Sequence, residues 1–159
     1  MLHQILLTEL FFYALFISCL SNQFTHWSTV GFSFGALCFV FVFHCPSEII
    51  SFNNKLKEFK SRNTEVIAVS VDSHFTHLAW KNTDVNKGGI GEVQFPMVAD
   101  VKHEIVQAYG IEFADAGVAL RASFLIDKEG IVQHQVVNNL PLGRNVDEML
   151  RLVDALQFH

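Results

Sequence analysis

The sequence predicts an α/β fold in which helices flank a central mixed β-sheet. Apolar, β-branched runs alternate with segments of helical periodicity, and the last two runs are joined by a short turn, as in an antiparallel hairpin. The 159 residues are the length of one ordinary domain. Half of them are hydrophobic and 17% are charged, a composition that excludes an intrinsically disordered chain.

The first predicted unit is a strand that leads directly into a helix. Residues 37–43 form a continuous apolar run, which is typical of a strand buried on both faces. Pro46 suits the first position of a helix, and Glu48 in the first turn complements the helix dipole. Apolar residues then recur at helical spacing as far as Phe59, so we expect one helix over 46–61.

The remaining elements continue this alternation, and each is bounded by turn or capping residues. They are a strand over 65–71, a helix capped by Asp72 or Ser73, a flexible glycine-rich loop over 87–91, a strand over 95–99, a helix over 102–109, two hairpin strands over 121–127 and 131–137, and a final helix capped by Asn145.

The N-terminal third differs in composition from the rest. Residues 1–54 contain no Lys or Arg, whereas the remainder carries all 11 basic residues. The apolar run over 5–20 is interrupted by Glu9, is shorter than the roughly 20 residues that span a bilayer, and follows no fixed positive charge. Three interpretations stay open: a packed or aberrant soluble N-terminus, a membrane-inserted segment, and a cleaved signal peptide.

Charge and cysteine content exclude several classes of function. The formal net charge of −5 argues against nucleic acid as a partner, because phosphate binding needs clustered positive charge. Three cysteines without a CxxC pair suggest neither a secreted disulfide scaffold nor a zinc ribbon. His74 and His77 share a helix face, yet no carboxylate or thiol completes a metal site there. We therefore expect a cytoplasmic protein without a metal, with membrane association through residues 5–20 as the lesser alternative.

Cys45 is the candidate nucleophile, because it lies at the junction between the first strand and the first helix. The unpaired N–H groups and the dipole at a helix N-terminus favour a thiolate over a thiol. Thiolate is the nucleophilic form of cysteine. The alternative is an inert buried residue, which is the usual state of a free cysteine.

The residues around Cys45 carry a resemblance to a known family. Residues 43–48 read FHCPSE, which resembles the F-V-C-P-[ST]-E motif of the peroxiredoxins. The similarity continues through four further blocks, over 66–80, 88–105, 117–130 and 138–158. Over 39–159 the chain resembles the typical two-cysteine peroxiredoxins, including the peroxidase subunit of alkyl hydroperoxide reductase. The resemblance implies a thioredoxin-like domain over 39–159, C-terminally truncated, after a divergent apolar segment over 1–38.

The resemblance also implies an activity and a set of site residues. The activity is thiol-dependent reduction of hydrogen peroxide and organic hydroperoxides through a sulfenic acid on Cys45, without a cofactor. Arg121 falls at the family's active-site arginine, Pro46 belongs to the cysteine motif, and Glu48 and Arg144 match the pair that holds the arginine. The implied partners are a thiol reductant (thioredoxin or a flavin-dependent disulfide reductase) and further copies of the chain, in a homodimer or a ring of dimers.

Two departures from the family pattern keep a second function open. Val42 stands where the family has a threonine whose hydroxyl orients the peroxide. No cysteine follows Cys45, so we expect no partner disulfide at the family's resolving position. The alternative to an active peroxidase is an impaired peroxiredoxin fragment that acts as an oligomer subunit or a holdase-like interaction protein.

Overall fold

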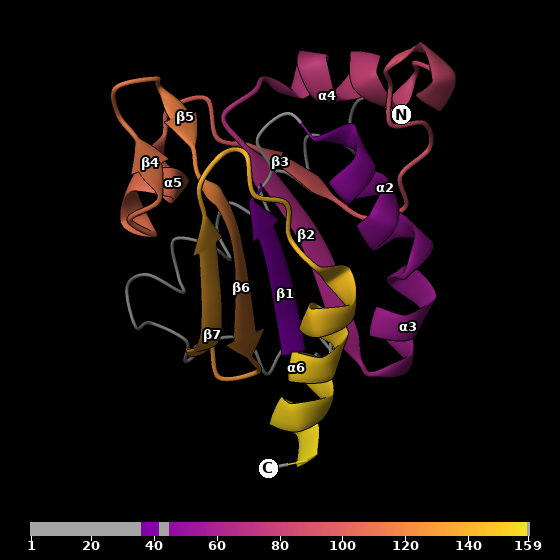
Figure 1. The fold of residues 1–159 in the computed structure, drawn as a ribbon, viewed down its shortest axis with the longest axis vertical. Coiled ribbons are helices and arrows are strands. Elements are labelled where there is room, and N and C mark those ends of the chain that lie inside the picture. Colours follow the sequence, from indigo (N-terminus) through magenta and orange to yellow (C-terminus); the bar gives the residue numbers. More distant parts are fainter. Residues whose placement is uncertain (1–35, 42–44, 159) are drawn as a thin grey trace, which may run out of the picture. The chain divides into compact units, whose positions relative to one another are not determined.

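The computed structural model describes residues 36–41 and 45–158, shown in Figure 1. Its elements follow the predicted alternation of strands and helices. They are β1 (Ala36–Phe41), α2 (Pro46–Asn54), α3 (Leu56–Ser61), β2 (Thr64–Ser70), α4 (His74–Lys81), η2 (Val85–Lys87), β3 (Met97–Ala99), α5 (Glu104–Ala108), β4 (Glu112–Phe113), β5 (Val118–Ala119), β6 (Arg121–Asp127), β7 (Val132–Asn138) and α6 (Val146–Phe158).

A mixed β-sheet forms the centre of the fold, which confirms the predicted class. Its strand order is β3-β2-β1-β6-β7, with β1, β2 and β3 parallel and β6 and β7 antiparallel to their neighbours. Because β6 runs against β1, the end of β1 lies beside the start of β6, and Phe41 pairs with Ala122. The C-terminal end of β1 therefore lies at the same end of the sheet as Arg121, the first residue of β6.

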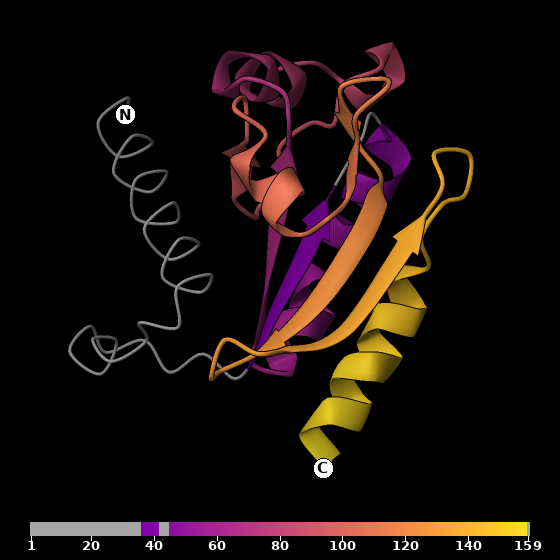
Figure 2. The ribbon, with the colours of Figure 1, turned by 90° about the vertical axis from the view of Figure 1, so that its left-hand side faces the viewer.

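Helices cover both faces of the sheet, as Figure 2 shows for α6 and α5 on opposite sides. On one face, α2, α3 and α6 bury a common apolar cluster that includes Phe52, Phe59 and Met149 together with Leu125 of β6. On the other face, the ring of Tyr109, which follows α5, packs edge-on against Phe124 with ring centroids 4.7 Å apart. Burial of the apolar cluster that α2 shares with α3, α6 and the sheet holds α2, and thus its first residues, against the sheet.

The helix expected over 46–61 is interrupted at Lys55. The backbone of Lys55 has φ −93° and ψ 2°, and the chain starts the separate helix α3 directly afterwards. Phe52, Leu56 and Phe59 stay buried across the break. The apolar periodicity therefore continues through Lys55, which is why the sequence pattern did not reveal the interruption.

The loop over 87–91, expected to be flexible, makes backbone hydrogen bonds to α4 and to the residues that follow α4. The amide of Gly89 donates to the carbonyl of Asp84 at 3.0 Å, and that of Ile90 donates to the carbonyl of Trp80 at 3.1 Å. The side chain of Ile90 is buried. A Cβ on Gly89 would lie 2.0 Å from the carbonyl oxygen of Thr83, so the glycine is required by the close approach of two backbone segments.

The two-residue strands β4 and β5, which pair with each other, were not predicted because a pattern of two residues carries no periodicity. Among the helices of the described ranges, none is long and apolar enough to span a membrane. The apolar run over 5–20 lies outside those ranges, so its three interpretations remain predictions.

Candidate active site

Cys45 is the residue that caps the N-terminus of α2. Its carbonyl accepts hydrogen bonds from the amides of Glu48 at 3.2 Å and Ile49 at 3.3 Å, so the backbone turns into the helix at this position. Pro46 occupies the first helical position, where the missing N–H costs no intrahelical hydrogen bond. The Cys45 sulfur is partly exposed and lies at the positive end of the helix dipole.

The surroundings of the sulfur favour its anionic form. Partial burial raises the pKa of the Cys45 thiol, but hydrogen bonds from the Ser47 hydroxyl, the Arg121 guanidinium and the Glu48 amide outweigh burial, so the pKa lies below the ordinary value. The sulfur is 3.1 Å from Ser47 Oγ. A lower pKa increases the thiolate fraction at neutral pH, and thiolate is the form that attacks electrophiles.

Arg121 is the first residue of β6, and the protein holds its guanidinium on two sides. Its Nε donates to the carbonyl of Leu140, and its Nη1 lies 2.6 Å from Glu48 Oε2. The Arg121 side chain is 15% exposed. The cation is thus fixed next to the thiol with little freedom to turn towards solvent.

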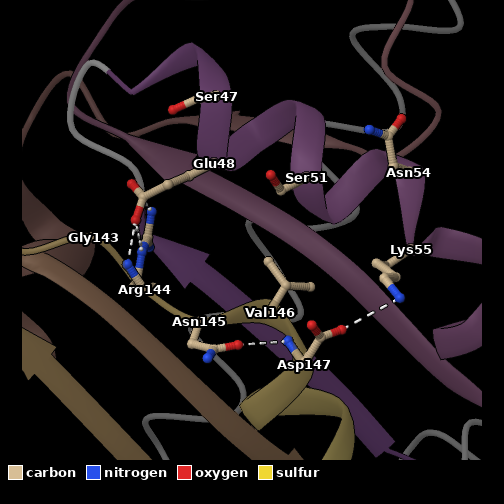
Figure 3. Close-up of a pocket in the computed structure, with 10 residues that line it drawn as sticks. All are labelled: Ser47, Glu48, Ser51, Asn54, Lys55, Gly143, Arg144, Asn145, Val146 and Asp147. Atoms are coloured by element: carbon tan, nitrogen blue, oxygen red, sulfur yellow. Dashed lines mark hydrogen bonds and ion pairs between the residues drawn. The ribbon is translucent and has the colours of Figure 1, made fainter.

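Glu48 and Arg144 form a buried ion pair, which Figure 3 shows as two side chains joined by dashed lines. Arg144 Nε lies 3.2 Å from Glu48 Oε1 and Arg144 Nη2 lies 3.0 Å from Oε2, while the Arg144 amide donates to Oε1 at 2.6 Å. Arg144 Nη1 donates to the carbonyl of Ala122 on β6. The Glu48 carboxylate therefore joins two arginines that come from different elements.

The ionisation of Glu48 follows from these contacts. Burial alone raises the pKa of the Glu48 carboxyl, but the hydrogen bonds and charge of Arg144, with the charge of Arg121, lower it below the usual value. Glu48 stays charged near neutral pH and accepts hydrogen bonds from both arginines. Such charge-assisted, two-pronged contacts fix the plane of a guanidinium as well as its position.

A polar groove lies beside the ion pair, between α2 and the start of α6 (Figure 3). Its volume is about 570 Å³. Asn145 caps α6, its side-chain oxygen accepting from the amides of Asp147 and Glu148, and Lys55 lies 3.3 Å from Asp147 across the groove. The lining residues are Ser47, Glu48, Ser51, Asn54, Lys55, Gly143, Arg144, Asn145, Val146 and Asp147.

The structure brings together the predicted site residues that it describes, namely Cys45, Pro46, Glu48, Arg121 and Arg144. Val42 lies outside the described residues. Ser47 belongs to the cysteine motif, but the motif did not predict its contact with the sulfur. The signal for it was available, since a hydroxyl two residues after a helix-capping cysteine lies in the same first turn.

The two histidines considered for a metal site make unrelated contacts. His77 is buried, with Nε2 2.7 Å from Ser70 Oγ, whereas the ring of His74 packs on that of Phe75 with centroids 4.0 Å apart. Within residues 36–41 and 45–158, no three His, Cys, Asp or Glu side chains gather in a way that could hold a metal ion.

Comparison with known proteins places the chain in a family. Residues 31–135, which begin upstream of the boundary predicted at 38/39, match the model of the AhpC/TSA family. The chain is 57% identical over 119 residues to alkyl hydroperoxide reductase C of Buchnera aphidicola subsp. Schizaphis graminum, covering 75% of this chain and 60% of that protein. It is 56% identical over 118 residues to the chloroplastic 2-cysteine peroxiredoxin of Chattonella marina var. antiqua, covering 74% of this chain and 60% of that protein.

A solved structure agrees with these matches. The reduced 2-Cys peroxiredoxin of Plasmodium vivax superposes with a TM-score of 0.75 at 47% identity, covering 79% of this chain and 67% of the other. This similarity confirms the predicted thioredoxin-like fold. The chain spans about 60% of the length of the first curated relatives that it matches. On its sequence and its fold, the chain belongs to the AhpC/TSA family of peroxiredoxins.

Proposed function

We propose that the protein is a thiol-dependent peroxidase that reduces hydrogen peroxide and organic hydroperoxides at Cys45. The observation that carries the proposal is the position of the Cys45 sulfur, at a helix N-terminus and beside an arginine that Glu48 holds in place. Membership of the AhpC/TSA family supports it. A site that stabilises a thiolate next to a fixed cation suits attack on a neutral peroxide, whose departing oxygen becomes negative in the transition state.

The proposed reaction is one displacement at oxygen. The Cys45 thiolate attacks the terminal oxygen of the hydroperoxide, an S–O bond forms, and the O–O bond breaks with its electron pair on the departing oxygen. That oxygen takes up the proton of the hydroperoxide and leaves as water or an alcohol, while the sulfur is oxidised by two electrons to a sulfenic acid, in its anionic form. Hydrogen-bond donors that face the departing oxygen accelerate such a step.

Within this reaction we assign Arg121 as the catalytic cation. Its guanidinium touches the reacting sulfur and keeps further N–H donors for the peroxide oxygens. Glu48 and Arg144 are positioning residues, because they act through Arg121. Pro46 sets the first turn of α2 and thereby the place of the sulfur.

Rapid-mixing kinetics with hydrogen peroxide and an organic hydroperoxide test this proposal. Cys45→Ser abolishes the reaction, whereas Cys38→Ser and Cys19→Ser leave it close to wild type. Arg121→Lys retains the charge but loses the fork of donors, and we expect the second-order rate constant to fall on the order of 10²-fold. Equal peroxide consumption by Cys45→Ser and the parent protein would refute the proposal and favour the impaired-fragment alternative.

A sulfenic acid on Cys45 has to be reduced by a thiol before Cys45 can react again. We propose that this thiol comes from a second protein with a dithiol. Cys19 and Cys38, the other cysteines of this sequence, both precede Cys45. One thiol of a dithiol protein of the thioredoxin type, or of a flavin-dependent disulfide reductase, would condense with the sulfenic acid to a mixed disulfide, and the sulfenic oxygen would leave as water. The second thiol of that protein would then attack the mixed disulfide, form the protein's own disulfide and release Cys45 as the thiol. A reducing compartment such as the cytoplasm suits this cycle.

We further propose that two copies of the chain pair through β7. This strand lies at an edge of the sheet, so one side of its backbone has no strand partner within the described sheet. Ile131, Val132 and Val137 are 59%, 41% and 42% exposed, an apolar edge that antiparallel pairing with a second copy would cover. Light scattering on Val137→Lys should show a smaller species than the parent protein, and an unchanged mass would contradict the pairing.

A ring of dimers needs a second contact surface, and we propose that α4 and η2 provide it. Phe75, Leu78 and Val85 are 69%, 49% and 55% exposed on these neighbouring elements. Phe75→Glu should then leave dimers where the parent forms larger rings, whereas Val137→Lys separates the two subunits of each dimer.

We also propose that the chain divides into a divergent segment over 1–38 and a peroxiredoxin domain over 39–159. Fractionation of cell membranes tests whether residues 5–20 act as an anchor.

A further inference from the structure

Ser47 makes a contact with the reacting sulfur that the proposed mechanism does not use. Its Oγ lies 3.1 Å from the Cys45 sulfur, and Ser47 is exposed at the second position of α2. Among the residues that the structure describes, the Ser47 hydroxyl has no hydrogen-bond partner besides this sulfur. The hydroxyl proton is therefore available to the sulfur.

The direction of this hydrogen bond follows from the charge of the sulfur. A thiolate carries no proton and can only accept, so the Ser47 hydroxyl donates when Cys45 is ionised. When Cys45 is protonated, the thiol is a weak donor and a weak acceptor, and the contact contributes less. An interaction that is stronger with the charged form shifts the equilibrium towards that form.

The first turn of α2 makes this donor independent of the arginine. Only Pro46 separates Ser47 from Cys45, and the ring of Pro46 restricts the backbone between them. Arg121, in contrast, belongs to β6 and is held by Glu48 and by the carbonyl of Leu140. The Ser47 contact is therefore made within one turn of helix, whereas the contact with Arg121 joins the sulfur to a different element, β6.

We propose that Ser47 is a catalytic residue of the peroxidase proposed above: its hydroxyl donates a hydrogen bond to the Cys45 thiolate and keeps the sulfur ionised near neutral pH. This inference rests on Cys45 being the reacting sulfur. As the S–O bond forms, the negative charge leaves the sulfur, and the same hydroxyl is free to donate to the new sulfenate oxygen. No proton is transferred from Ser47 in either state.

The pH dependence of alkylation tests this role without peroxide. Iodoacetamide labelling is followed from about pH 5 to 10, and the rate at Cys45 is read from its own peptide, so that any labelling of Cys19 or Cys38 is counted separately. In Ser47→Ala we expect the rate at pH 7 to fall about fivefold to tenfold. Loss of one hydrogen bond to a charged group lowers the thiolate fraction by more than about tenfold, and the higher nucleophilicity of the less stabilised thiolate recovers part of the rate. The profile moves to higher pH, and the plateau at alkaline pH is equal to or above that of the parent protein, since a less stabilised thiolate is more nucleophilic.

Two further variants separate a hydrogen bond from a general disturbance of the helix. Ser47→Thr retains the hydroxyl and should reproduce the parent profile. Ser51→Ala removes an exposed hydroxyl one turn further along α2 and should also leave the profile unchanged. If the pH profile of Cys45 alkylation in Ser47→Ala coincides with that in Ser51→Ala, the inference is overturned. A rate reduced by the same factor at every pH also overturns it, because that pattern indicates lost structure and an unchanged pKa.

A parallel measurement distinguishes failure of this inference from failure of the proposed function. The peroxide reaction of the parent protein reports on the peroxidase, and the alkylation profiles report on the Ser47 contact. If Cys45 does not react with peroxide while Ser47→Ala still moves the alkylation profile, the proposed function fails and the hydrogen bond stands. If Cys45 reacts with peroxide but the two alanine profiles coincide, Ser47 has no role.

Discussion

Replacing Glu48 by glutamine should destabilise the protein far more than an ordinary carboxylate substitution. The Glu48 side chain is 8% exposed and accepts from Arg121 and Arg144, whose side chains are 15% and 1% exposed. Glutamine has the same shape but only one acceptor oxygen, and its NH₂ group would face N–H donors. Removal of one partner of a buried ion pair costs about 3–5 kcal/mol, because the remaining charge loses its compensation.

For a protein of this size, such a loss lowers the midpoint of thermal unfolding by roughly 10 °C. The matched control is Glu58→Gln. Glu58 lies 3.0 Å from Lys55 on the surface, with its side chain 47% exposed, so its removal should leave the midpoint close to that of the parent. Differential scanning calorimetry of the three proteins at neutral pH measures the difference directly.

The pH dependence of the stability difference between the parent protein and Glu48→Gln supplies an independent check. Burial raises the pKa of Glu48, but the contacts with Arg144 lower it more, so the folded-state pKa lies below the ordinary value. A group with a depressed folded-state pKa contributes its full stability above its ordinary pKa and loses this contribution as the pH falls through the folded-state pKa. The stability gap between the parent and Glu48→Gln should therefore narrow in acid. A gap that equals the Glu58→Gln control at neutral pH, or that stays constant into strong acid, would refute the reasoning.

Three other predictions follow from particular positions. Gly89→Ala brings a Cβ to 2.0 Å from the Thr83 carbonyl oxygen and should lower the free energy of unfolding, measured by chemical denaturation, by about 1–3 kcal/mol. Gly143→Ala is the control, because the nearest atom to its Cβ would lie at 3.6 Å, and it should be tolerated. Equal stability of the two variants would contradict the packing described for Gly89. Val42→Thr should raise the rate of peroxide reduction on the order of 10²-fold in stopped-flow experiments, since a hydroxyl could hold the peroxide oxygen. An unchanged rate would show that the missing hydroxyl at position 42 does not limit peroxide reduction. Turnover should depend on added thiol, and excess peroxide should convert Cys45 to sulfinic acid, visible by mass spectrometry as added oxygen; a thiol-cleavable dimer as the main product would point to Cys19 or Cys38 as a resolving partner.

The sequence predicted the parts of the site that depend on neighbouring residues. A buried strand followed at once by Cys45 and Pro46 specifies a cysteine at a helix N-terminus, because strand and helix patterns meet there. The contacts of Glu48 with Arg121 and Arg144 are different. Glu48 is 73 positions from Arg121 and 96 positions from Arg144 along the chain, so no periodicity relates them. The family resemblance alone indicated that these three residues form a group.

The features that escaped prediction depend on geometry without a local pattern. The interruption at Lys55 leaves the apolar spacing intact, and the strands β4 and β5 are too short to show alternation. The glycines over 88–91 indicated a flexible loop and gave no sign that Gly89 packs closely against the backbone of Thr83. Glycine permits both outcomes, and only the tertiary contacts decide between them.

The central claim is that Cys45 is the sulfur that peroxide oxidises, and trapping of its sulfenic acid tests it most directly. The reduced protein is mixed with one equivalent of hydrogen peroxide in the presence of dimedone, digested and mapped by mass spectrometry. The predicted result is a dimedone adduct on the Cys45 peptide, with Cys19 and Cys38 unmodified and no adduct in Cys45→Ser. An adduct mainly on Cys19 or Cys38, or peroxide consumption without any modification of Cys45, would contradict the account.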